Sequence, residues 1–252
     1  MFDDVLKDIT IKKENKEQGI FNGVPFPISS YSQYFSSFNK GAYIGILGGT
    51  GTGKSKFKRW LFYNMLDFSY ANNYPIKILD FSLEDDRIKV FKKIIAHYIY
   101  KFEGLSASTN FIDSKENPLT DKYYKAIIKY ESFFKRLEND WYIINSSTSP
   151  NQILASANKV HKSFGESHHI FACVDNYSNV TRDSDDKDEW TAIRRLSRNI
   201  GRLELCKNKD MTFMGIFQMD ADTEKNAFRT AAKGTIASIE PNLASIGDAK
   251  VV

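Results

Sequence analysis

The chain has 252 residues, of which 42% are hydrophobic and 26% charged, and this ordinary globular composition excludes a disordered or fibrous protein. The length allows one full-sized domain, and 35 basic against 31 acidic residues give a net charge of +4, which permits contact with phosphate without demonstrating it. The two cysteines form no metal motif, no signal peptide is visible, and no apolar run is long enough to span a membrane. We therefore expect a soluble, cytoplasmic protein with no membrane contact.

The pattern of apolar residues predicts alternating strands and helices. Residues 1–40 mix polar and aromatic residues, and we interpret them as a lead or linker before one domain at 41–252. Short apolar runs predict strands at 42–47, 76–82, 141–145, 168–175 and 211–218. Helical spacing predicts helices at 54–70, 85–102, 121–137, 150–164 and 188–207. Because parallel strands need crossovers, the predicted fold class is α/β, with a mainly parallel central sheet flanked by helices on both faces.

The same spacing predicts which side chains of three helices face the core. These side chains are apolar and recur every three or four residues. They are Ile88, Phe91, Ile94, Ile95 and Tyr98 in the second helix, Tyr124, Ile127, Ile128 and Phe134 in the third, and Trp190, Ile193, Leu196, Ile200 and Leu203 in the last.

A glycine-rich loop follows the first strand and opens the first helix. Its sequence matches the phosphate-binding pattern G-x-x-x-x-G-K-[ST] in full, and it lies between a strand and a helix as the mechanism requires. We expect its backbone N–H groups to surround phosphates, Lys54 to reach the β- and γ-phosphates of ATP, and Ser55 to offer a hydroxyl to Mg²⁺. The loop residues are Gly48, Gly49, Thr50, Gly51, Thr52, Gly53, Lys54 and Ser55.

Two acidic residues at strand ends complete a candidate ATPase site. Asp175 ends the strand 168–175, where ligands of parallel sheets bind, and is the candidate Mg²⁺ ligand; the alternative is an aspartate that caps a turn. The next residue is Asn176, so no glutamate stands beside this aspartate. Glu84 follows the strand 76–82 and is the candidate base that polarises water; the alternative is an acidic residue in the first helical turn.

A strand-end amide is the third candidate. Gln218 ends the strand 211–218, where its side chain could sense the γ-phosphate and pass that signal to the following loop. The alternative is an ordinary polar residue at the surface.

The order of these motifs resembles the RecA-like ATPase core, and more narrowly the DnaB family of replicative DNA helicases. The resemblance covers roughly residues 20–252 and rests on an ordered set of short motifs: a lead at 23–41, Phe-Ser-Leu-Glu at 81–84, Leu-Ser-Arg-Asn-Ile at 196–200, Gln218 at a strand end and Asp-Ala-Lys-Val-Val at 248–252. It implies a ring-shaped homohexamer that encircles single-stranded DNA, uses ATP and Mg²⁺ at subunit interfaces, and has a primase or other replisome protein as partner.

The chain also departs from this family. Only 47 residues precede Gly48, too few for the family's primase-contacting domain, which favours a bacteriophage-type or reduced member. No basic residue follows Gln218 at 219–221, Glu240 replaces an arginine, and Lys250 replaces an acid. The chain ends before the position of the family's arginine finger, so we expect a domain truncated before its last strands, a finger from a partner, or a slow ATPase.

Two loops would face DNA in such a ring. The loop 177–189 is rich in aspartate, and we interpret it as a solvated acidic loop. The loop 220–234 mixes positive charge with an aromatic ring, which suits phosphate contact and base stacking, although an ordinary surface loop is the alternative. Its candidate DNA-binding residues are Lys225, Phe228, Arg229 and Lys233.

The leading hypothesis is thus an ATP-dependent DNA helicase motor domain. A second is a RecA-like recombinase or a regulatory ATPase similar to clock proteins, which hydrolyses ATP without unwinding DNA; the acidic loop 177–189 favours it. A third is a nucleotide-binding scaffold with negligible turnover.

Overall fold

The computed structural model describes residues 1–31, 33–106 and 119–219. Its main sheet has five strands in the order β3-β7-β6-β4-β5, and every pairing between them is parallel. The strands are β3 (Tyr43–Gly48), β4 (Ile76–Ser82), β5 (Trp141–Ile144), β6 (His169–Asp175) and β7 (Thr212–Gln218). Each predicted strand is present within one residue at either end, which confirms the predicted α/β class.

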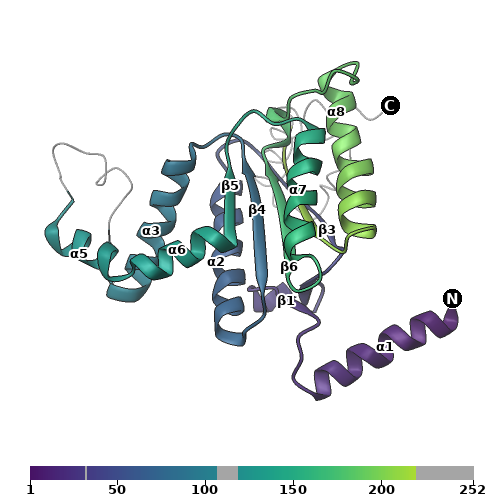
Figure 1. Cartoon of the computed structure of the whole chain (residues 1–252), viewed down its shortest axis with the longest axis horizontal. Coiled ribbons are helices and arrows are strands. Elements are labelled where there is room, and N and C mark those ends of the chain that lie inside the picture. The colour runs from purple at the N-terminus through teal and green to yellow at the C-terminus, as the bar shows by residue number, and fades with distance from the viewer. Residues whose placement is uncertain (32, 107–118, 220–252) are drawn as a thin grey trace, which may run out of the picture.

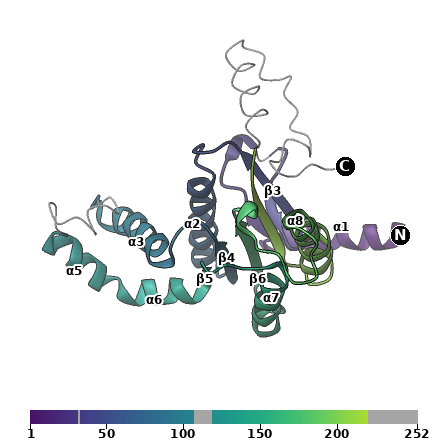
Figure 2. The ribbon, with the colours of Figure 1, turned by 90° about the horizontal axis from the view of Figure 1, so that it is seen from above.

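Helices cover both faces of this sheet, with α2 and α7 on opposite sides (Figures 1 and 2). Successive side chains of a strand point to opposite faces, so Ile78 of β4 joins the core beneath α2 while Leu79 joins the core beneath α7. The helices are α2 (Lys54–Asn72), α3 (Arg87–Glu103), α5 (Asp121–Lys129), α6 (Glu131–Asp140), α7 (Pro150–Phe164), α8 (Glu189–Arg195) and the π-helix η3 (Leu196–Lys207), with a short 3₁₀ turn η2 (Tyr177–Asn179) after β6.

The first forty residues hold more structure than a linker. Helix α1 (Phe2–Glu17), all of whose residues are described, has no buried side chain and projects away from the sheet (Figure 1). After it, β1 (Gly23–Pro25) and β2 (Ser37–Asn39) pair antiparallel around the 3₁₀ turn η1 (Ser29–Tyr31), and Val24 and Phe38 are buried in the core beneath α2. The prediction missed α1 because its few apolar residues contact no core, and the domain boundary at residue 40 stays a prediction.

The helix predicted at 121–137 is wrong in one respect, because it is two helices. Tyr130 ends α5 and begins α6 with φ −104° and ψ 21°, outside the helical region, and its hydroxyl donates to Glu103 at 2.7 Å. The change of direction shifts the buried stripe, so Tyr124 and Ile128 are 56% and 50% exposed although we expected them in the core. Ile88, in the first turn of α3, is likewise 65% exposed.

The last predicted helix changes geometry midway. From Leu196 to Lys207 the backbone is π-helical, with more residues per turn than an α-helix. Leu196 and Ile200 are buried as expected, but Leu203 is 48% exposed, and Leu205 and Cys206 take the inner positions instead. The prediction for Leu203 is wrong because it assumed the α-helical period throughout. None of the helices within the described ranges is both long and apolar enough to cross a membrane.

Candidate active site

The glycine-rich loop joins the end of β3 to the start of α2. Gly51 and Gly53 have φ of +74° and +93°, the left-handed region that side chains other than glycine adopt only with strain. The ammonium of Lys54 donates to the carbonyl oxygens of Gly48 at 2.8 Å and Gly49 at 2.6 Å, and the Thr52 hydroxyl donates to Gly49 at 2.8 Å. The loop therefore curls around its own lysine.

This loop suits a chain of phosphates. No side chain in the described part of the protein caps the N-terminus of α2, so a cap does not satisfy the first N–H groups of this helix. Free N–H groups at the positive end of a helix dipole attract an anion, and Lys54 adds a full positive charge at the same place. Ser55, the second residue of α2, brings a hydroxyl to this end.

The carboxyl ends of the neighbouring strands meet beside the loop. In the sheet register Gly48 of β3 pairs with Gln218 of β7, and Ser82 of β4 pairs with Asp175 of β6. The Gln218 amide donates to the Thr50 hydroxyl of the loop. The predicted strand-end residues thus lie on one edge of the sheet.

Asn176 links these strand ends to one another. Its side-chain amide donates to the Glu84 carboxylate at 3.2 Å and to the Gln218 carbonyl oxygen at 3.3 Å. A chain of hydrogen bonds therefore runs from Glu84 through Asn176 and Gln218 to Thr50. The sequence analysis gave Asn176 no role, although its place directly after Asp175 at a strand end was a signal.

Glu84 lies in the bend between β4 and α3. Its side chain is exposed, and α3 begins only at Arg87, capped by the Asp86 carboxylate, which accepts from the Ile88 and Lys89 amides. The alternative that Glu84 is a first-turn residue of this helix is therefore wrong.

The next residue, Asp85, fixes this bend. It accepts from Lys93 at 2.8 Å and lies 3.5 Å from Arg59 of α2. Partial burial alone would raise the pKa of Asp85, but the hydrogen bond and charge of Lys93, together with Arg59, lower it. The bend that carries Glu84 is thus tied to α2.

Asp175 is held by a lysine that the sequence analysis missed. The ammonium of Lys58 lies 2.9 Å from Asp175 Oδ2 and 2.8 Å from Asp80 Oδ1, and the Trp141 indole donates to Asp80 Oδ2 at 3.1 Å. Burial alone would lower the pKa of Lys58, but the two carboxylates outweigh it and raise the pKa. The signal was positional, because Lys58 shares a helical face with the apolar Leu61, one turn away.

The oxygen groups at this edge suit Mg²⁺ when nucleotide is bound. Within the described ranges no three His, Cys, Asp or Glu side chains are grouped to hold a metal. Mg²⁺ commonly binds through one or two carboxylates together with substrate phosphates and water, so a complete protein cage is not needed. Ser55 and Asp175 are the groups that would hold the ion, which supplies charge for the phosphates when it is bound.

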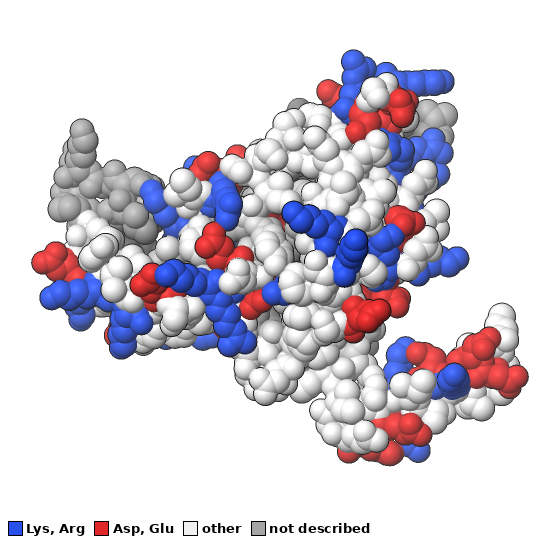
Figure 3. Space-filling model, in the orientation of Figure 1, with Lys and Arg blue, Asp and Glu red and all other residues white. Residues whose placement is uncertain are grey.

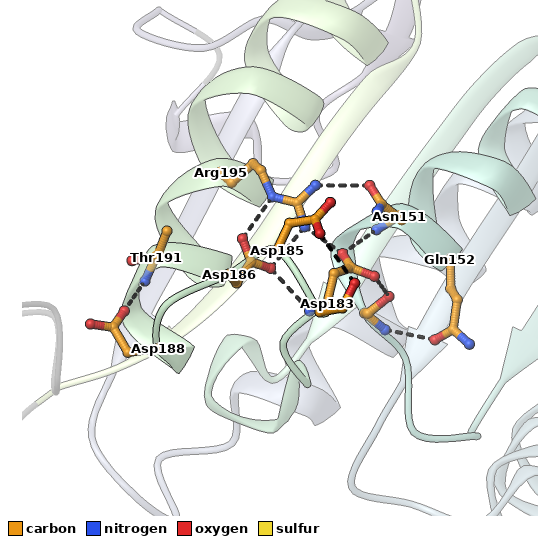
Figure 4. Close-up of polar contacts among 10 residues, drawn as sticks. Asn151, Gln152, Asp183, Asp185, Asp186, Asp188, Thr191 and Arg195 are labelled. Carbon is orange, nitrogen blue, oxygen red and sulfur yellow. Dashed lines mark hydrogen bonds and ion pairs between the residues drawn. The ribbon is translucent and has the colours of Figure 1, made fainter.

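The acidic loop after β6 is folded onto a helix, not solvated as expected. The Arg195 guanidinium of α8 donates to both carboxylate oxygens of Asp186, at 3.0 and 2.8 Å, and to Asp183 (Figure 4). It also donates to the Asn151 side chain of α7 at 2.8 Å, and Asp183 accepts from the Ser149 hydroxyl. Arginine neutralises the loop and fastens it to both helices, which the charge pattern alone did not indicate.

Basic and acidic side chains are interspersed over the described part of the face shown in Figure 3. Charge on this face therefore does not single out a DNA-binding surface. The predicted DNA-binding residues Lys225, Phe228, Arg229 and Lys233 lie outside the described residues, as does the motif at 248–252.

Comparison with known proteins identifies the fold. No protein-family model and no curated protein matches the sequence. Among solved structures, the ATPase domain of a phage helicase matches with a TM-score of 0.73 and 14% identity over 99% of this chain and 78% of that one. The chain has a DnaB-type fold. A DnaB-like replicative helicase, described with its interactions with primase, matches with a TM-score of 0.69 and 13% identity over 96% of this chain.

These matches confirm the RecA-like core that the sequence motifs implied. The chain spans 53% of the length of the DnaB-like helicase, so about half of that protein has no counterpart in it. At this level of identity the likeness carries the fold, and the chemistry depends on the side chains at the sheet edge.

Proposed function

We propose that this chain is the ATP-dependent motor domain of a DNA helicase, which hydrolyses ATP to translocate on single-stranded DNA during replication. The observation that carries the proposal is the hydrogen-bonded chain from Glu84 through Asn176 and Gln218 to Thr50 of the phosphate loop. It joins the candidate base, the candidate sensor and the loop at one edge of a DnaB-type fold.

Each predicted site residue has a role in this proposal. The loop from Gly48 to Gly53 and Lys54 bind the phosphates, and Ser55 and Asp175 hold Mg²⁺. Glu84 accepts a proton from the attacking water, a function worth about 10²–10⁴-fold in rate. Gln218 contacts the γ-phosphate, and because it ends β7 its movement reaches the loop that follows.

Assembly and partners are part of the same proposal. We infer a homo-oligomer, most simply a hexameric ring around single-stranded DNA, with a primase or another replisome protein as partner and the loop 220–234 as the DNA contact. Support comes from the fold and from the match to a helicase that is described together with primase. The phage helicase match is to an ATPase domain alone, which agrees with a motor domain of this size.

A regulatory ATPase that does not unwind DNA is the second candidate. The observation that favours it is the loop after β6, where Asp183 and Asp186 are fastened to Arg195. A neutralised, fastened loop offers less positive charge to DNA than a free basic one.

The test is ATP hydrolysis by the purified chain with Mg²⁺, with and without single-stranded DNA, together with separation of a forked duplex. The proposal predicts hydrolysis that DNA stimulates and duplex separation that requires ATP. Hydrolysis that ignores DNA and separates no duplex would favour the regulatory ATPase. Bound nucleotide without turnover would indicate the scaffold and contradict both.

A further inference from the structure

Lys58 lies between two carboxylates in the interior, one helical turn beyond Lys54 of the phosphate loop. The side chains of Lys58 and Asp80 are 0% exposed and that of Asp175 is 4% exposed. One buried ammonium thus faces two carboxylates. Such a group must be paired to be tolerated, because an isolated buried charge costs several kcal/mol.

Asp80 alone would suffice to pair this lysine. It accepts from Lys58 on one oxygen and from the Trp141 indole on the other, so both of its oxygens have donors. The second contact of Lys58, to Asp175 Oδ2, is therefore not required to neutralise the ammonium. Its consequence falls on Asp175, the residue that ends β6 at the edge where the phosphate loop lies.

We propose that Lys58 is a positioning residue that orients Asp175 and sets its affinity for Mg²⁺, and that Asp80 controls how strongly Asp175 experiences the lysine charge. This inference rests on the proposed role of Asp175 toward Mg²⁺. Lys58 occupies Oδ2 and leaves Oδ1 of Asp175 for the ion or its water. A positive charge in contact with a metal ligand also weakens its attraction for a divalent cation, so Mg²⁺ binding depends more on the nucleotide phosphates.

The inference predicts opposite effects for two variants that both remove a buried partner. In Lys58→Met the repelling charge is gone, so Asp175 attracts Mg²⁺ more strongly. In Asp80→Asn the Trp141 donor keeps an acceptor, but Lys58 then acts on Asp175 alone, so Mg²⁺ binds more weakly. In the double variant the affinity follows Lys58→Met, because Asp80 acts only through the lysine.

The experiment is a Mg²⁺ titration of the binding of a fluorescent ATP analogue to the full chain, with urea unfolding of each variant in the absence of Mg²⁺. We expect the half-saturating Mg²⁺ concentration to fall by about tenfold in Lys58→Met and in the double variant, and to rise by about tenfold in Asp80→Asn. The matched control is Lys77→Met, which removes another lysine, 9% exposed and 2.8 Å from Asp140, at the far end of β4. It loses stability but keeps the Mg²⁺ midpoint of the wild type.

Shifts in the same direction for Lys58→Met and Asp80→Asn, or midpoints equal to that of Lys77→Met, would overturn the inference. If Lys58→Met does not fold, the rise expected in Asp80→Asn still decides it. A wild-type chain that binds the analogue without any Mg²⁺ dependence would instead overturn the proposed role of Asp175 and this inference together. Normal dependence in the wild type with unchanged variants would refute only the role of Lys58.

Discussion

Two networks of one cation and two aspartates lie at opposite ends of the segment that follows β6. In the inner network Lys58 joins Asp80 and Asp175, and in the outer one Arg195 joins Asp183 and Asp186. Their composition is alike, but their exposure is not, because the Lys58 side chain is 0% exposed and that of Arg195 is 26% exposed.

Burial gives the two networks different functions. The inner ammonium is a single charge whose removal would leave two carboxylates in the interior, so this network affects the stability and charge of the nucleotide edge. The outer guanidinium makes several hydrogen bonds at once and ties the loop to α7 and α8. The segment from Asn176 to Arg182 is therefore held at both ends, by the active-site edge and by the helices.

The largest expected effect is that of Lys58→Ala. Because two buried carboxylates lose the cation that lies between them, the free energy of unfolding should fall by about 3–5 kcal/mol. Urea unfolding at neutral pH measures it. Removing Asp80 as well, in Lys58→Ala/Asp80→Asn, should recover part of the loss. A loss below about 1 kcal/mol for Lys58→Ala would mean that the two networks do not differ as their burial indicates.

Arg195→Ala should cost less, about 1–3 kcal/mol, because water can solvate the freed carboxylates. The stabilisation by Arg195 should also weaken in high salt, which screens exposed pairs but hardly reaches buried ones. Urea unfolding in low salt and in about 1 M NaCl separates the two networks. An equal salt effect on Lys58→Ala and Arg195→Ala would contradict the comparison.

Acid should weaken the outer network. The hydrogen bond from Arg195 lowers the pKa of Asp186 below its usual range. A carboxyl whose pKa is lower in the folded chain stabilises the fold above its unfolded pKa and loses this contribution as the pH falls through the folded value. The stability gap between wild type and Arg195→Ala should therefore narrow on acidification below about pH 4. A gap that widens there would contradict the assigned charges.

The smallest effect is expected at Leu203, on the helix that continues from Arg195. Its side chain is 48% exposed, so Leu203→Ser should change the free energy of unfolding by at most about 0.5 kcal/mol. The matched variant Leu205→Ser changes a fully buried leucine and should be strongly destabilising. Equal losses would mean that the helix keeps the α-helical period after Leu196.

The elements that the sequence predicted well carry local signals. Helix α7 runs over the predicted residues because Pro150 occupies its first position and Ser149 and Gln152 form a capping box. The strands were equally clear, since each is an apolar run between breakers. The phosphate loop and its strand-end companions could be predicted because parallel strands end at one edge of a sheet.

What the sequence did not reveal depends on partners distant along the chain. Lys58 resembles a surface lysine until Asp80 and Asp175 are placed beside it, 22 and 117 positions away. Likewise the acidic loop appears solvated until α8 brings Arg195 against it. The phase of Leu203 depends on a π-helical stretch whose residues show no local mark of it.

Binding and turnover of ATP in matched variants test the central claim most directly. The measurement compares nucleotide bound and phosphate released, with Mg²⁺ and single-stranded DNA, for wild type, Lys54→Ala, Glu84→Gln and the exposed control Glu166→Gln. The account predicts that Lys54→Ala loses binding and that Glu84→Gln binds ATP but loses about 10²-fold or more in turnover, while Glu166→Gln matches the wild type. Turnover by Glu84→Gln equal to that of Glu166→Gln would contradict it.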